Sequence, residues 1–323
     1  MSDKELTEQV KEHARKSGAD LVGIASMDRF EGAPKQMDPR YIFPDARAMI
    51  GLGFRLPRGY FRGIEEGTYY NAYGFMGYAG LNVIYAPIVL RNLSVFLEDN
   101  GYEGAPIPNM FDGSAVDMYD TGEKLPIWTR AVSPEKPAPN VLLNFRIAAY
   151  LCGMGEIGYS KMFLTPEFGP RQRFAFILTD APLVPDPIFE GKICDRCMSC
   201  VKECSGCAIS RTEKESVEVA GRKLEWGKLD CKKCSVAYRG GARETSPFLN
   251  PDVKESEYND EWFGGKKLNE NLTLNGIAML ETRAPIEGAK GCIRACMIHL
   301  EQQGKLKNTF KEPFRKRKPW KLS

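Results

Sequence analysis

The most informative stretch of this sequence is Cys194-Asp-Arg-Cys197-Met-Ser-Cys200-Val-Lys-Glu-Cys204. Three thiolates at this spacing can hold one face of a 4Fe-4S cluster, and in two-cluster ferredoxins the fourth cysteine ligates the other cluster. A zinc site is a poorer match, because four-cysteine zinc sites usually pair two short loops. The stretch therefore predicts an iron–sulfur domain.

A later cysteine pair can complete the first cluster. Cys292 and Cys296 have the spacing of the last two cysteines in a ferredoxin half. The last cysteine of such a half crosses to the other cluster. We therefore expect the first cluster to be held by Cys194, Cys197, Cys200 and Cys296.

The second cluster needs two ligands besides Cys204 and Cys292. An ordinary ferredoxin would place one of them three residues before Cys292, where this sequence has Ala289. The pair Cys231-x-x-Cys234 can fill the gap, and Cys207 competes with Cys231 for the role. We expect the second cluster to be held by Cys204, Cys231, Cys234 and Cys292.

The cysteines also suggest how the chain is divided. None precedes Cys152, which has the character of a buried apolar cysteine, and all the others follow residue 193. Three prolines between residues 182 and 187 interrupt helix and strand alike. We expect one domain over residues 1–188 and a ferredoxin-like domain over residues 189–323, consistent with a length of 323 residues.

Charge and composition limit the possible partners and location. The 45 basic and 42 acidic residues nearly cancel, so the whole protein has no general attraction to nucleic acid or membrane. No apolar run of about 18 residues and no N-terminal signal stand out, which predicts a cytoplasmic protein without a membrane span and with reduced thiols. The basic end, Lys305 to Lys321, is typical of a solvated tail but could bind RNA or an acidic redox partner.

The first domain reads as a mixture of helices and strands. Apolar periodicity predicts helices over residues 6–18, 85–97 and 140–152, and strands over 20–25, 44–53 and 173–179. The many aromatics and the glycines of residues 59–85 predict a loop-rich segment. Because no regular βαβ period emerges, we expect an α+β or three-layer αβα fold.

Two motifs before the cysteine run are less specific than that run. Gly153-Met-Gly155-Glu-Ile-Gly158 fits G-x-G-x-x-G, but the helix predicted over residues 140–152 precedes it where a dinucleotide site needs a strand. A tight connection, or close approach of backbone to a large ligand, fits better. Arg171 and Arg173 could hold a carboxylate or phosphate, or could form ordinary surface ion pairs.

Several segments resemble one enzyme superfamily. Gly155-Glu-Ile-Gly158, Leu164-Thr-Pro-Glu-Phe-Gly-Pro-Arg-Gln-Arg173 and the cysteine run are similar to the cobalamin-dependent reductive dehalogenases. Gly18 to Ala25 and Pro44 to Gly51 resemble both these enzymes and the epoxyqueuosine reductases. The resemblance implies a nitroreductase-like, corrinoid-binding αβα domain followed by a ferredoxin-like domain with two 4Fe-4S clusters. It also implies base-off cobalamin without a protein histidine ligand, which agrees with only two histidines in the chain.

The resemblance also suggests site residues. A tyrosine beside a basic residue donates the proton in the dehalogenases, and Tyr85 or Tyr78 lies nearest that position. The matching glycine–arginine segment implies cofactor or substrate contacts from Gly155, Gly158, Thr165, Gly169, Arg171 and Arg173.

These observations predict an oxygen-sensitive, cytoplasmic oxidoreductase. An external one-electron donor, such as ferredoxin or flavodoxin, would supply the clusters, and these would reduce a corrinoid for reductive cleavage of a small molecule. One alternative is an electron-transfer protein without corrinoid. Another is a tRNA-modifying reductase of the epoxyqueuosine type, although Pro139-Asn140-Val141 lacks the acid that those enzymes carry there.

Overall fold

The computed structural model describes residues 2–69, 72–109, 129–238 and 291–314. Its helices are α1 (Asp3–Lys16), α2 (Arg62–Glu66), α3 (Ala86–Asp99), α4 (Phe145–Leu151), α5 (Ser199–Lys202), α6 (Cys231–Tyr238) and α10 (Cys292–Gln302), with a π-helix, η5 (Ala72–Tyr85). Its strands are β1 (Leu21–Ser26), β2 (Ala48–Arg55), β3 (Gly104–Ile107), β4 (Glu156–Ile157), β5 (Phe163–Leu164), β6 (Gln172–Thr179), β7 (Ile209–Val219) and β8 (Arg222–Leu229).

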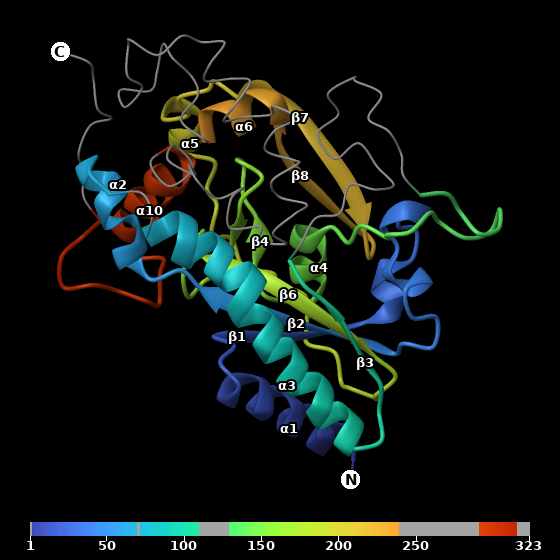
Figure 1. The fold of residues 1–323 in the computed structure, drawn as a ribbon. Helices are drawn as coiled ribbons and strands as arrows, with labels where there is room; N and C mark the ends of the chain where they lie inside the picture. The colour runs from blue at the N-terminus through green and yellow to red at the C-terminus, as the bar shows by residue number, and fades with distance from the viewer. Residues whose placement is uncertain (1, 70–71, 110–128, 239–290, 315–323) are drawn as a thin grey trace, which may run out of the picture.

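A four-stranded antiparallel sheet in the order β1-β2-β6-β3 forms the centre of the fold (Figure 1). Alternate side chains of β2 face opposite ways, as the twofold period of a strand requires. Ile50 and Leu52 join a core with α1 and α3, whereas Met49 joins a second core with α4. The described residues thus form a mixed α/β fold with helices on both faces of the sheet.

The helix α1 forms because its sequence caps the N-terminal backbone N–H groups and places apolar side chains on the buried face. Ser2 and Glu5 make a capping box at its start, and Gly18 follows its end with φ +116°. Leu6, Val10 and Ala14 recur at helical spacing and are buried against the sheet. The predicted helix at 6–18 is therefore confirmed.

The predicted strands are confirmed, whereas the start of one predicted helix and one predicted loop need correction. The strands expected at 20–25, 44–53 and 173–179 appear as β1, β2 and β6. The helix expected from residue 140 begins at Phe145, because the Asn144 side chain accepts a hydrogen bond from Ile147 N (3.3 Å) and caps it there. The loop-rich reading of residues 59–85 is wrong for 72–85, which are wound as a π-helix running into α3.

That continuous helical stretch, Ala72–Asp99, also corrects the expectation of no membrane-length apolar segment. It is 28 residues long and contains an 18-residue window with a mean hydropathy of 1.4, enough by length and composition to cross a membrane. Its α3 part packs on α1 and β6, with Val89, Leu93 and Leu97 buried in the core. A helix that is buried in a protein core can have the same length and composition as this stretch.

The cysteine-rich part is joined to the sheet rather than set apart from it. Met297, Leu300, Leu306 and Phe314 belong to the same hydrophobic core as α1 and β2. Between the first cysteine run and Cys231, β7 and β8 form a hairpin that the sequence analysis missed. The hairpin is anchored where Gly227 N donates to the Tyr159 carbonyl (2.9 Å).

Candidate metal centres and active site

The first group of thiols lies where a loop and α10 meet. Cys194, Cys197 and Cys200 come from the loop and the start of α5, and Cys296 comes from α10, which packs on α5. Burial and the neighbouring thiols Cys194 and Cys197 raise the pKa of Cys200 to about 11. Burial first, and then the thiols of Cys194 and Cys200, raise the pKa of Cys296. Thiols gathered in this way suit a cation that would bind them as thiolates.

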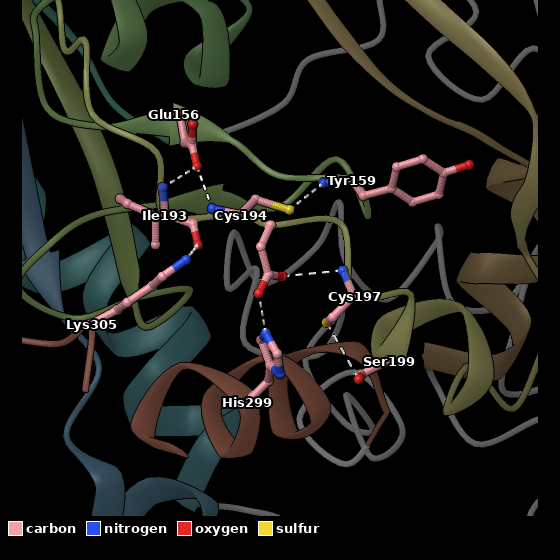
Figure 2. A network of polar contacts seen from close by, with 9 residues as sticks. Glu156, Tyr159, Ile193, Cys194, Cys197, Ser199, His299 and Lys305 are labelled. Atoms are coloured by element: carbon pink, nitrogen blue, oxygen red, sulfur yellow. Dashed lines mark hydrogen bonds and ion pairs between the residues drawn. The ribbon is translucent and has the colours of Figure 1, made fainter. Parts of the chain in front are cut away.

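A network of polar contacts fixes the loop that carries this first group (Figure 2). Glu156 accepts hydrogen bonds from the backbone N–H groups of Ile193 (2.7 Å) and Cys194. Tyr159 N donates to Cys194 Sγ (3.4 Å), and Lys305 Nζ donates to the Ile193 carbonyl (3.0 Å). The start of the cysteine run is thereby held between β4 and the chain after α10.

The same network reaches the outer cysteine of the group. Asp195 accepts a hydrogen bond from Cys197 N (3.1 Å) and pairs with His299 of α10 (2.7 Å). The Cys197 thiol lies 3.4 Å from the Ser199 hydroxyl and is solvent-exposed. The first group therefore has one corner open to solvent.

The second group of thiols adjoins the first. Burial first, then the thiols of Cys234 and Cys204, raise the pKa of Cys292 to about 12. Burial, Cys204 and Cys231 raise the pKa of Cys234 to about 11. Cys207 is exposed, has a left-handed backbone (φ +47°) and is not among these principal neighbours. The structure thus brings together the eight cysteines that the sequence analysis expected as ligands, and their soft sulfur donors fit iron–sulfur clusters. Their division into two sets of four stays a prediction from the spacing, because Cys200 is also a neighbour of Cys292, and Cys292 of Cys296.

Beside the second group, three tyrosines surround Arg173 of β6. The guanidinium donates to the Tyr73 hydroxyl (3.2 Å) and lies over the Tyr78 ring, 4.3 Å from its centroid. The Tyr78 and Tyr238 ring centroids are 6.4 Å apart. These tyrosines raise the pKa of Arg173 although burial opposes this. The side chains form a tyrosine–arginine group defined by Tyr73, Tyr78, Tyr238 and Arg173.

The winding of η5 brings two of these tyrosines together. Tyr73 and Tyr78 are five residues apart, and in an α-helix that spacing rotates two side chains by about 140°. The i→i+5 pattern of a π-helix instead brings residues five apart close to one face. Both rings can therefore contact the same arginine.

Tyr85 lies elsewhere. Its ring is partly exposed and packs edge-on against Phe54 (5.8 Å between centroids), and its hydroxyl donates to the Gly18 carbonyl (3.2 Å). Of the two tyrosines that the sequence analysis singled out, the structure places Tyr78, and not Tyr85, beside Arg173.

Apart from Arg173, the residues expected to contact a cofactor bind parts of the protein outside the tyrosine–arginine group. A Cβ atom at Gly155 (φ +156°) would lie 2.0 Å from the Leu164 carbonyl oxygen, and Gly158 N donates to the Met162 carbonyl. Thr165 Oγ1 donates to Gln172 Oε1 (3.2 Å), and Gly169 (φ +59°) packs against Leu300 and Leu306. This segment forms a tight connection between α4 and β6.

Arg171, like Thr165, is fully buried. It donates to the Leu56 carbonyl (2.6 Å) and to Asn308 Oδ1 (2.7 Å), and burial lowers its pKa to about 10. These contacts tie the chain after α10 to the end of β2.

Sequence reasoning missed Tyr238, which belongs to the tyrosine–arginine group, and Arg146, which lies near it. Arg146 of α4 interacts electrostatically with Arg173 and with the thiols of Cys234, Cys231 and Cys292. Its side chain is solvent-accessible, yet the surrounding protein desolvates it enough to lower its pKa. Tyr238 ends α6, the helix that begins at Cys231. The short spacing from Cys234 to Tyr238 was the only sequence signal for its place.

Comparison with known proteins identifies homologues. No protein-family model matches the chain. It is 27% identical over 261 residues to a tetrachloroethene reductive dehalogenase of Dehalobacter restrictus, covering 74% of this chain and 46% of the relative. It is 24% identical over 282 residues to an epoxyqueuosine reductase of Bacillus cereus, covering 79% of this chain and 61% of the relative. Its homologues are thus reductive dehalogenases and epoxyqueuosine reductases.

A solved structure shares the fold. The catabolic reductive dehalogenase NpRdhA aligns with a TM-score of 0.50 and 17% identity, covering 99% of this chain and 43% of that one. The chain spans about half the length of the dehalogenases that it matches.

Proposed function

We propose that this chain is an iron–sulfur oxidoreductase that uses a corrinoid for reductive cleavage of a small molecule. The observation that carries the proposal is the gathering of eight cysteine thiols, of which Cys292 lies near Tyr73 and hence near Arg173. The homology to reductases supports the reaction class.

The two thiol groups would hold two 4Fe-4S clusters. The exposed Cys197 corner makes the first cluster the entry point for electrons from an external one-electron carrier, such as ferredoxin or flavodoxin. The second, none of whose four cysteines is as exposed as Cys197, would pass them inward. In this assignment Cys231, and not Cys207, completes the second set.

A corrinoid, when bound, would supply low-potential cobalt chemistry for the cleavage. The residues fit the histidine-free binding mode that the resemblance implies, because His13 stacks on Phe96 and His299 pairs with Asp195. We assign Arg173 to this site, and the segment from Gly155 to Arg171 to the protein wall that supports it.

The protein's own part in the reaction is to deliver a proton and to bind charge. Two electrons and one proton would replace the bond to the leaving group by a C–H bond, and the leaving group would depart as an anion. The Tyr78 hydroxyl would supply the proton, while Arg173 beneath its ring fixes its orientation and stabilises the tyrosinate.

The test is the content of iron and cobalt per chain after anaerobic purification and incubation with cobalamin. We expect about eight irons, four for each cubane cluster, and about one cobalt that is retained through desalting. Iron without cobalt would overturn the corrinoid reaction and favour electron transfer alone. Iron near four would overturn the second cluster.

The epoxyqueuosine reductases favour a second candidate, reduction of a modified tRNA base. Their match covers more of this chain and more of the relative than the dehalogenase match does. Asn140 stands where the resemblance would place an acid. Binding of a tRNA stem-loop that weakens when the basic end after Lys305 is neutralised would support this candidate, and its absence would remove it.

A further inference from the structure

Two adjacent residues in the turn between β4 and β5 contact the first group of thiols. Tyr159 N donates to Cys194 Sγ at 3.4 Å (Figure 2). The hydroxyl of the next residue, Ser160, forms a hydrogen bond with the Cys200 thiol, and this contact opposes the rise in that thiol's pKa. The turn therefore directs two polar groups at sulfur atoms that we expect to hold the first cluster.

The turn that carries these groups is fixed by contacts of its own. Lys161 N donates to the Gly158 carbonyl (2.9 Å) and closes the turn between the two paired strands. The Tyr159 carbonyl accepts a hydrogen bond from Gly227 N of β8 (2.9 Å). A polar group on a rigid element keeps its geometry while the charge beside it changes. Ser160 is thus held in place by contacts that do not involve the thiols.

A second hydroxyl lies at the open corner of the same group. The Ser199 Oγ atom of α5 is 3.4 Å from Cys197 Sγ (Figure 2). Cys197 is exposed, whereas Cys200 is buried. Water can replace a lost hydroxyl beside the exposed sulfur, but the protein shields the buried one. The Ser160 contact should therefore have a larger effect than the Ser199 contact.

Hydrogen bonds to sulfur change the energy of a bound cluster. Once the cysteines are thiolates, they can only accept, so the serine hydroxyls donate to them. Reduction adds one negative charge to the cluster and its thiolates, and hydrogen bonds to a charged acceptor are the stronger ones. The reduction potential of a cluster accordingly depends on hydrogen bonds to its sulfur atoms. Both hydroxyls are placed to stabilise the reduced form.

From this arrangement we propose that Ser160, and to a smaller extent Ser199, raises the reduction potential of the first cluster through hydrogen bonds to its cysteine ligands. The inference rests on the proposed function and adds two positioning residues that bind neither iron nor substrate. A higher potential makes the transfer of one electron from the external carrier to this cluster more favourable. Ser160 in this way sets how readily the chain accepts electrons.

The experiment is an anaerobic redox titration of the iron-loaded protein at one pH, followed by electron paramagnetic resonance. The signal that changes in Cys197→Ser identifies the first cluster. In Ser160→Ala the equilibrium constant for reduction of that cluster should fall by about two- to tenfold, the range for one hydrogen bond. At about 59 mV for each tenfold change, the potential becomes about 20–60 mV more negative. Ser199→Ala should shift the potential in the same direction by a smaller amount.

Controls separate a lost hydrogen bond from a general structural effect. Ser160→Thr keeps a hydroxyl at this position and should keep the parent potential. Ser210→Ala removes a hydroxyl that accepts from Thr212 N and Glu213 N in the hairpin, and it should change nothing.

An unchanged potential in iron-loaded Ser160→Ala, or an equal shift in Ser160→Thr, would overturn the inference. If Ser160→Ala does not retain its iron, Ser199→Ala decides, and a potential that is unchanged or higher in that variant overturns the inference. Fewer than about four irons per chain in the parent protein would instead count against the proposed function.

Discussion

At the residue scale, the structure separates two tyrosines that the sequence could not. Tyr78 stacks on Arg173, whereas Tyr85 donates to a backbone carbonyl at the end of α1. A proton donor needs a partner that stabilises its conjugate base, and only Tyr78 of the two has a cation beside it. Residue type alone could not decide between them, because both are tyrosines on one continuous helical stretch.

Replacing these tyrosines should therefore give different results. Tyr78→Phe should lower the rate of reductive cleavage by about 10²- to 10⁴-fold, the usual contribution of a positioned acid. Tyr85→Phe should cost at most about 1 kcal/mol of stability from its lost hydrogen bond and leave the rate intact. Single-turnover rates on both variants, with matched iron and cobalt content, measure this. A large loss of rate in Tyr85→Phe alone would reverse the assignment.

The cysteines allow a second comparison at this scale. Cys231→Ala should lower iron from about eight per chain toward four, because Cys231 lies within the second thiol group. Cys207→Ala should keep all the iron, because that thiol is exposed and outside the group. Iron analysis with electron paramagnetic resonance of the reduced clusters distinguishes them. The opposite result would exchange the two residues in the ligand set.

At the scale of elements, a buried ion pair anchors α10. Its arginine, Arg294, lies between Cys292 and Cys296 in the helix. Arg294 Nε donates to Glu65 of α2 at 2.8 Å, and both side chains are less than 10% exposed. Loss of one partner would leave an uncompensated charge in the interior. Because α10 carries Cys292 and Cys296, one ligand for each proposed cluster, its position affects both.

Glu65→Gln should accordingly lower the free energy of unfolding by about 3–5 kcal/mol, and iron content should fall with it. Glu12→Gln is the matched control, since the exposed Glu12–Lys16 pair on α1 should contribute about 0–1 kcal/mol. Denaturant unfolding and iron analysis of both variants provide the measurement. Equal stability of the two variants would show that the buried pair does not anchor α10.

At the scale of the whole molecule, the thiol groups join segments far apart in the chain. The first unites the run from Cys194 with Cys296, and the second unites Cys204, the α6 pair and Cys292. Clusters bound there would cross-link these segments in the folded state only. Metal binding would then add directly to folding stability.

Removing the iron should therefore destabilise the entire fold. Anaerobic chelation to less than one iron per chain should lower Tm by on the order of 10 °C, given about 2–4 °C for each kcal/mol in a chain of this size. Reconstitution with iron and sulfide should restore it. An unchanged Tm after complete removal would mean that the thiol groups do not depend on metal for their arrangement.

The sequence by itself determined the local chemistry of this protein. Cysteine spacing predicted two sets of four thiols, and apolar periodicity predicted α1, α3 and the strands β1, β2 and β6. These features depend on neighbours within a few residues, so a short window of sequence contains them. The helix start at Asn144 and the hairpin β7–β8 escaped because a local cap and an exposed, charged strand leave weak periodic signals.

Tertiary structure alone decided which side chains meet. Five residues of the glycine–arginine segment turned inward to bind the protein itself, while Arg146, Tyr238 and Arg173, from three separate elements, came together. The π-helical winding of η5 turned Tyr73 and Tyr78 to one side, against the α-helical period. The physical reason is that spacing fixes geometry along a chain, whereas contacts between distant segments follow from the packing of the shared core.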